Sequence, residues 1–207
     1  NLVLVTGLEK VQVYGGVKIA FDAVSVNGVG LPAAVYTSQS NMGGTRVDWI
    51  EGAGYVCVGG ADITFPAPPA STVAASWTAG GGADTSISNA ANWGGTLPNL
   101  TDGSLDATFA VGTGAALDRM GAAFNSLTLN ATGVWDFTNP NENYFAYLGA
   151  GGLTTVGTGK TYTYRWPTML LQPQTWTIAG SDKLVVNAAL AGTSKLVIEG
   201  ANSTVDF

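Results

Sequence analysis

Short apolar triplets separated by turn residues recur along the C-terminal part of the chain. In residues 174–207 the triplets W-T-I, L-V-V, L-V-I and V-D-F alternate with turns built on Gly, Ser, Asp and Asn. The strands start at Trp176, Leu184, Leu196 and Val205, so every second strand returns after 20 or 21 residues. This return matches one coil of a stacked β-solenoid, and it would also suit a sandwich of two sheets.

The first part of the chain alternates strands and turns in the same way. Within residues 10–14 and 17–21 the apolar positions have a period of two, which gives each strand one buried and one solvent-facing side. Clusters of Gly, Asn or Ser separate the predicted strands, which cover residues 2–5, 10–14, 17–26, 33–37, 46–50, 54–58 and 62–65. We therefore predict a small antiparallel β-sandwich or open barrel.

A proline-rich segment, P-A-P-P-A-S-T at residues 66–72, interrupts this pattern. Proline cannot donate a ladder hydrogen bond, and it biases the backbone toward an extended, stiff spacer. The sequence thus predicts an all-β protein in three parts. These are a sandwich-like docking or assembly domain at residues 1–66, a linker at 67–76, and a β-solenoid or second sandwich at 77–207.

Composition narrows the class of partner. Only 11% of the 207 residues are charged, the net charge is −6, and the eight Lys and Arg are scattered, which argues against a nucleic-acid partner. No apolar run approaches the roughly 18 residues of a membrane span. The single cysteine, Cys57, lies in the apolar run Y-V-C-V and is expected to be a buried small hydrophobe. The chain opens on Asn1, as expected of a processed chain or of a portion of a longer one.

Several short motifs follow one another in a family-specific order. They are W-T-A-G-G-G-A-D at residues 77–84, S-N-A-A-N-W at 88–93, D-A-T-F at 106–109, N-S-L-T-L at 125–129, Y-L-G-A-G-G-L at 147–153 and Q-T-W at 174–176. Over residues 76–207 this order resembles the repeat of autotransporter-associated β-strand proteins. The resemblance implies a passenger-like parallel β-helix. A β-domain followed by such a module is also similar in architecture to a phage virion appendage.

The chain has no histidine, which excludes the Ser-His-Asp and Cys-His arrangements and His-based metal sites. Paired carboxylates remain possible, because β-helix hydrolases cut polysaccharides with acidic residues alone. The candidate pairs are Asp102 with Asp106, Asp136 with Glu142, and Asp182 with Glu199. Turn capping is the favoured role for these acids, and we expect no catalytic, cofactor-binding or metal residues.

Two further groups of residues have both a functional and a structural interpretation. An oxygen-rich stretch could hold Ca²⁺, although its spacing matches no calcium loop and turn capping explains it better; it comprises Asp84, Asn89, Asn92, Asn99, Asp102 and Asp106. Aromatic side chains stack on sugar rings, so Tyr162, Tyr164 and Trp166 are the candidates for glycan contact, with core packing as the alternative.

The sequence therefore favours a non-enzymatic structural protein of an extracellular surface. The preferred setting is a virion decoration or fibre subunit that docks through its first domain and projects a β-rich module. It would form a homo-oligomer, with a trimer favoured, within a larger particle or filament. The expected assembly edges are Leu2, Val3, Leu4, Val5, Val205 and Phe207. The alternatives are a bacterial cell-surface, autotransporter-like adhesin that binds glycans, and a β-helix enzyme that degrades polysaccharides.

Overall fold

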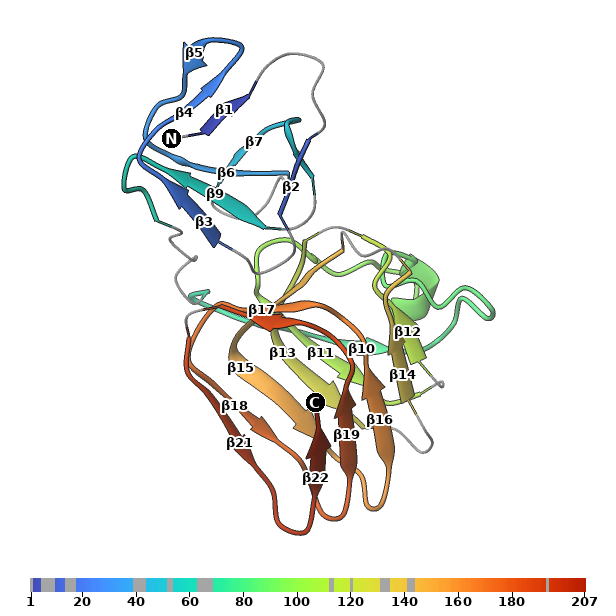
Figure 1. Ribbon diagram of the computed structural model, residues 1–207. Coiled ribbons are helices and arrows are strands. Elements are labelled where there is room, and N and C mark those ends of the chain that lie inside the picture. The colour runs from blue at the N-terminus through green and yellow to red at the C-terminus, as the bar shows by residue number, and fades with distance from the viewer. Residues whose placement is uncertain are drawn as a thin grey trace. The chain divides into compact units, whose positions relative to one another are not determined.

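The computed structural model (Figure 1) describes most of the chain, and it is all-β. The described residues are 2–4, 10–13, 18–38, 44–51, 54–62, 69–111, 114–119, 121–130, 135–140, 144–192 and 194–207. They contain 22 strands and one short 3-10 helix, and none of their helical residues forms a segment able to span a membrane. The chain divides into two compact units, Asn1–Pro66 and Ala67–Phe207.

The first unit consists of short strands in three small sheets. The sheets have the orders β1-β4-β5, β2-β8 and β3-β9-β6-β7. The strands are β1 (Leu2–Leu4), β2 (Val11–Gln12), β3 (Lys18–Phe21), β4 (Val24–Val26), β5 (Val29–Gly30), β6 (Val35–Thr37), β7 (Thr45–Arg46), β8 (Ile50–Glu51) and β9 (Tyr55–Val58). Apolar side chains from these strands share one core, which includes Val13, Val24, Tyr36, Ile50, Val56 and Val58. Cys57 on β9 is also buried, as predicted, and burial raises the pKa of its thiol.

Strand pairing in this unit is mixed, where the sequence predicted an antiparallel arrangement. The hairpin β4–β5 and the pair β6–β9 are antiparallel, but β1–β4, β2–β8, β3–β9 and β6–β7 are parallel. The hairpin turns on Asn27 and Gly28, both with positive φ, as a tight two-residue turn requires. A period of two shows which side of a strand is buried. It does not show which remote strand becomes the neighbour or in which direction that neighbour runs.

The second unit is a β-solenoid, in agreement with the sequence prediction, and each pair of its named strands is parallel. The chain alternates between two sheets, which we call the large sheet and the small sheet (Figure 1). The large sheet holds β10 (Val73–Trp77), β11 (Leu105–Phe109), β13 (Ala122–Leu129), β15 (Ala146–Thr155), β17 (Thr168–Leu170), β18 (Gln174–Thr177), β20 (Leu190–Ala191) and β21 (Leu196–Glu199). The small sheet holds β12 (Gly114–Ala116), β14 (Trp135–Thr138), β16 (Thr161–Tyr164), β19 (Lys183–Val186) and β22 (Thr204–Asp206).

Coil lengths follow from the strand registers. In the last coils Tyr162 pairs with Leu184 and Leu184 with Val205, returns of 22 and 21 residues. The first coil is longer, since Trp77 pairs with Phe109 after 32 residues, and the extra residues form a loop around the 3-10 helix η1 (Ala90–Trp93). Strand β10 also begins inside the stretch that the sequence predicted as a linker, because Val73 to Trp77 pair with β11.

Strand β15 turns a corner of the coil at its glycines. Its first residues pair with β17 and its last residues pair with β18. At the corner Gly152 has a φ of 63°, and a Cβ placed there would lie 2.2 Å from the carbonyl oxygen of Thr175. Only glycine tolerates both this backbone conformation and this close approach. The G-A-G-G run at residues 149–152 therefore lets the single strand β15 pair with both β17 and β18.

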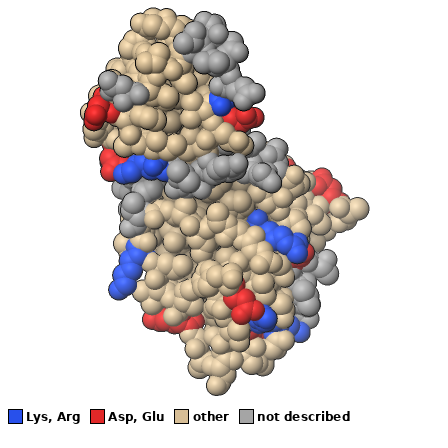
Figure 2. All heavy atoms as spheres, in the orientation of Figure 1, with Lys and Arg blue, Asp and Glu red and all other residues tan. Residues whose placement is uncertain are grey.

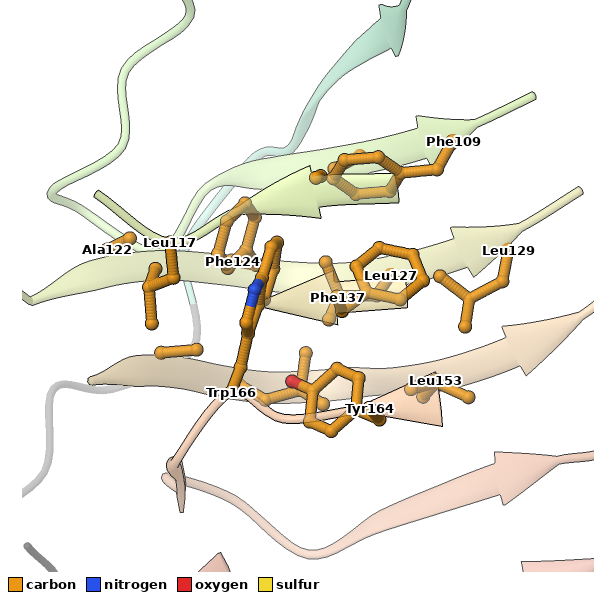
Figure 3. Close-up of a cluster of buried hydrophobic side chains, with 14 of the residues drawn as sticks. Phe109, Leu117, Ala122, Phe124, Leu127, Leu129, Phe137, Leu153, Tyr164 and Trp166 are labelled. Carbon is orange, nitrogen blue, oxygen red and sulfur yellow. The ribbon is translucent and has the colours of Figure 1, made fainter. Parts of the chain in front are cut away.

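Aromatic rings fill the core of the solenoid (Figure 3). Trp166 lies among Phe124, Phe137 and Tyr164: it stacks on Phe124 at 5.9 Å and meets Phe137 edge-on at 5.2 Å. Its indole nitrogen donates a hydrogen bond to the Thr138 carbonyl oxygen at 2.9 Å. Such aromatic pairs contribute about 0.5–1.5 kcal/mol each beyond the area that they bury.

Candidate functional sites on the solenoid

The three aromatic residues predicted to contact glycans lie in the core. Tyr162, Tyr164 and Trp166 each have 0% of their surface exposed. Tyr162 and Tyr164 do share one face of β16, as the period of two predicted, but that face points inward. The prediction of a glycan contact at these residues is therefore wrong, because a ligand outside the folded solenoid cannot reach their rings.

Asp102 and Asp106 have local structural roles. The carboxylate of Asp102 accepts hydrogen bonds from the side chain and backbone of Ser104, and these bonds hold its pKa below the usual value. Asp106 accepts hydrogen bonds from Ser126 at 2.6 Å and Asn125 at 2.7 Å. Desolvation works to raise the pKa of Asp106, but the hydrogen bonds outweigh it and the pKa is lowered.

The other candidate acids also bind protein groups. Asp136 forms a two-oxygen contact with the guanidinium of Arg165, at 2.8 and 2.6 Å. Asp182 is buried and accepts backbone N–H bonds from Gly157 and Lys160. Its proposed partner Glu199 is exposed on β21, and Glu142 lies outside the described residues. The structure thus gives Asp102, Asp106, Asp136 and Asp182 separate structural partners.

The oxygen-rich stretch is organised as turns. Asp84 accepts hydrogen bonds from the Ser86 backbone and the Asn89 side chain. These contacts lower the pKa of Asp84, and the contacts with Ser86 have the largest effect. Asn92 bridges the loop, since its amide contacts Gly81, Asp84 and Ser86. Asn99 donates to Asp102. In the part of the chain that the structure describes, no three His, Cys, Asp or Glu side chains gather as a metal site would require.

A column of hydroxyl side chains crosses the outer face of the large sheet, and the sequence analysis missed it. Register pairs one residue on each successive strand; the column runs Ser76, Thr108, Thr128, Thr154, Thr177 and ends at Glu199. Within the described ranges, the four threonine hydroxyls make no hydrogen bond to protein. Neighbouring coils lie about 4.8 Å apart, so the column repeats at that spacing. The number of residues between successive members of the column varies, so the column can be recognised only from the pairing register of the strands.

An open hollow of about 360 Å³ lies beside this column. Its lining combines threonine hydroxyls with corner residues: Ala150, Gly151, Thr154, Pro173, Gln174, Thr175, Thr177, Lys195 and Val197. The small sheet carries a different outer face, with the ion pairs Arg165–Asp136 and Lys183–Asp206 at 2.6 Å each. On the face that Figure 2 shows, charged side chains form small separate groups among mostly uncharged residues. The hydroxyl face of the large sheet is thus chemically distinct from the face of the small sheet.

The beginning of the solenoid is covered by its own loop. Trp93, at the end of η1, meets Trp77 of the first coil edge-on at 5.4 Å, and Leu100 from the same loop is 1% exposed. The helix is held by the Asn89 side chain, which accepts the Ala91 N–H, and it ends at Gly94 in the left-handed conformation. Trp77 and Phe109 are therefore as buried as residues in the middle of the solenoid.

The last coil has no such cover among the described residues. Strand β21 pairs only with β18, and β22 only with β19, so each leaves one edge unpaired. Leu196 and Val205 pack against the core but remain partly exposed, Ile198 is 37% exposed and Phe207 is 74% exposed. Two of the predicted assembly residues, Val205 and Phe207, thus lie in and next to β22, in the last described coil.

The predicted edge at the start of the chain is also an edge strand. Leu2, Val3 and Leu4 form β1, which pairs with β4 on one side, and Val3 is 64% exposed. Val5 lies outside the described residues.

Comparison of the chain with protein-family models, curated proteins and solved structures finds no match. The resemblance to autotransporter-associated repeats therefore stays a prediction.

Proposed function

We propose that this chain is a non-enzymatic structural protein of an extracellular surface, and that it works by assembling with other chains. The observation that carries the proposal is the edge strand β1, which among the described strands pairs only with β4 and whose Val3 is 64% exposed. An exposed strand edge is a template for pairing with another strand. A strand added there would cover Val3 and would satisfy the N–H and C=O groups at the open edge of β1.

The preferred setting is a virion surface, with the first unit docking and the solenoid projecting. Two features support this setting. The chain folds as two compact units, so one unit can be anchored while the other remains available. The surface carries few charges, so little electrostatic repulsion opposes close packing of many copies. A bacterial cell surface offers the same advantages to such a protein.

A pair of matched substitutions tests the assembly edge. Val3→Asp places a charge on the exposed edge strand β1, where a covering strand would lie against it. Val156→Asp is the control, because Val156 is 49% exposed and lies outside the described strands. We expect Val3→Asp to reduce association, measured as mass in solution by light scattering, while Val156→Asp leaves it unchanged. Equal association of both variants and the parent chain would oppose the proposal.

Glycan binding is a second candidate function, and the hydroxyl column favours it. Unpartnered threonine hydroxyls at a regular spacing, beside an open polar hollow, offer hydrogen-bond donors and acceptors to a polyhydroxylated chain. The triple variant Thr128→Val, Thr154→Val and Thr177→Val removes three hydroxyls but keeps side-chain shape. Its control is Thr161→Val with Thr163→Val on the small sheet. Loss of glycan-array signal in the first variant alone would support this function, and equal signals would oppose it.

A further inference from the structure

We propose that the ligand of the large sheet is a linear, uncharged polysaccharide that runs along the solenoid axis, with its sugar units on the hydroxyl column from Thr108 to Thr177. The inference rests on glycan binding, the second of the two functions proposed above, and it names the class of ligand and its direction. It starts from two features of one face, the direction of the column and the charges beside it.

The column determines the direction of the ligand. Register pairs one threonine on each of β11, β13, β15 and β18, which are Thr108, Thr128, Thr154 and Thr177 (Figure 1). Each step is one coil of about 4.8 Å, so these hydroxyls span about 14 Å. Because the row crosses the strands, a chain that contacts every member must cross the strands too. The ligand therefore extends along the solenoid axis.

The hollow beside the column holds one part of such a chain. Thr154 and Thr177 line it together with Thr175, which shares the outward face of β18 with Thr177. Ala150 and Gly151, with little or no side chain, form another part of its wall. Its volume of about 360 Å³ is near the lower end of the range for small-molecule sites, about 300–1,000 Å³. The hollow thus fits a short segment of a glycan, and the rest of the chain lies on the open column.

The charges on this face disfavour an acidic glycan. Asp106 lies two residues before Thr108 on the outward face of β11, and its lowered pKa keeps it ionised at neutral pH. Glu199 is exposed and pairs with Thr177. Lys195 is the one charged residue among those that line the hollow. These two carboxylates outnumber the ammonium group on a chain of net charge −6, so an acidic polymer is repelled and a neutral one is not.

Ligand length combined with the position of a substitution tests the inference. The probes are gluco-, manno-, xylo- and chito-oligosaccharides from disaccharide to hexasaccharide, with oligogalacturonates of the same lengths as the acidic series. Isothermal titration calorimetry measures their affinities. We expect the neutral hexasaccharide of at least one series to bind more tightly than its disaccharide, and the oligogalacturonates to bind more weakly than that series.

Three single variants locate the ligand along the column. Thr154→Val, in the hollow, should lower the affinity for every length by roughly three- to tenfold, the effect of one lost neutral hydrogen bond. Thr108→Val, two coils or about 10 Å from Thr154, should lower the affinity for the hexasaccharide by a similar factor and leave that for the disaccharide unchanged. Thr163→Val on the small sheet is the control and should change neither. Valine keeps the shape and strand preference of threonine, and circular dichroism checks that each variant is folded.

The outcomes separate this inference from glycan binding in general. A hexasaccharide affinity unchanged by Thr108→Val would overturn the axial direction, and tighter binding of oligogalacturonates than of the neutral series would overturn the ligand class. A parent chain that binds none of the neutral series would overturn the inference as a whole. In each case, loss of glycan-array signal in the triple threonine variant described above would still support glycan binding. Equal array signals would remove glycan binding and this inference together.

Discussion

The buried carboxylate of Asp182 accepts the backbone N–H of Lys160 at 2.9 Å, across 22 residues of chain. Its other oxygen accepts the Gly157 N–H at 3.0 Å, so one side chain ties the turn before β16 to the turn before β19. Charged acceptors make stronger hydrogen bonds than neutral ones. Asp182 thus joins successive coils at their turns, next to the backbone hydrogen bond from the Lys183 N–H to the Lys160 carbonyl oxygen at 2.7 Å.

Asp182→Asn should lower the free energy of unfolding by about 1–3 kcal/mol, because an amide offers only one oxygen and its NH₂ would face a backbone N–H. Urea unfolding measures the loss. Asp102→Asn is the matched control in an exposed turn, and it should have the smaller effect. An equal loss in both variants would contradict a coil-joining role for Asp182.

Trp166→Ala should destabilise the solenoid by about 3–5 kcal/mol, since it empties the centre of the aromatic core. Trp166→Phe should lose less, because it keeps the ring contacts and forfeits only part of the volume and the bond to Thr138. Thermal unfolding measures the stability of the two Trp166 variants. A fully stable Trp166→Ala variant would contradict the core assignment.

Gly152→Ala should be strongly destabilising, because the new Cβ would overlap the Thr175 carbonyl oxygen at the corner of β15. Gly159→Ala is the control, because it introduces a similar backbone strain without the clash. Gly159 has a similar φ of 68°, but its nearest neighbour would be the Ser181 hydroxyl at 3.6 Å. We expect about 1 kcal/mol for Gly159→Ala and several times that for Gly152→Ala. Equal losses, measured by urea unfolding, would show that the corner is looser than the structure indicates.

The protein should become less stable in acid, because protonation of Asp106 weakens its hydrogen bonds. Its folded-state pKa is below the ordinary value, so its hydrogen bonds with Ser126 and Asn125 stabilise the protein above about pH 4 and are lost as the pH drops through the lowered pKa. Asp106→Asn should therefore unfold more easily than the parent at neutral pH, and the difference should narrow below pH 4. A constant difference across this pH range would contradict the assignment.

The sequence predicted a β-solenoid or a second sandwich for the second unit, because the signals for strands and turns are local. Trp176, Leu184 and Val205 mark strands by apolar pattern and turn spacing, and the coil length follows from counting between them. Tyr162 and Tyr164 could be placed on one face in the same way. Whether that face points inward depends on the neighbouring coil, so their burial could not be predicted.

The parts that sequence reasoning missed depend on register and distant partners. Thr128 and Thr154 belong to one column only because a bulge near Asn125 shifts the pairing of β13 and β15. Asp182 sits in an ordinary G-S-D turn, and its burial beneath Gly157 and Lys160 is set one coil away. In the first unit, β3 finds β9 across 37 residues, and no local pattern encodes that parallel partner.

Imaging of the protein within its assembled particle, at a resolution that separates strands, tests the central claim most directly. We expect the free edge of β1 to be paired with a strand from another chain, and Val3 to be covered by it. A particle in which this edge faces solvent, while an acid-lined cleft elsewhere on the solenoid holds a substrate, would contradict it.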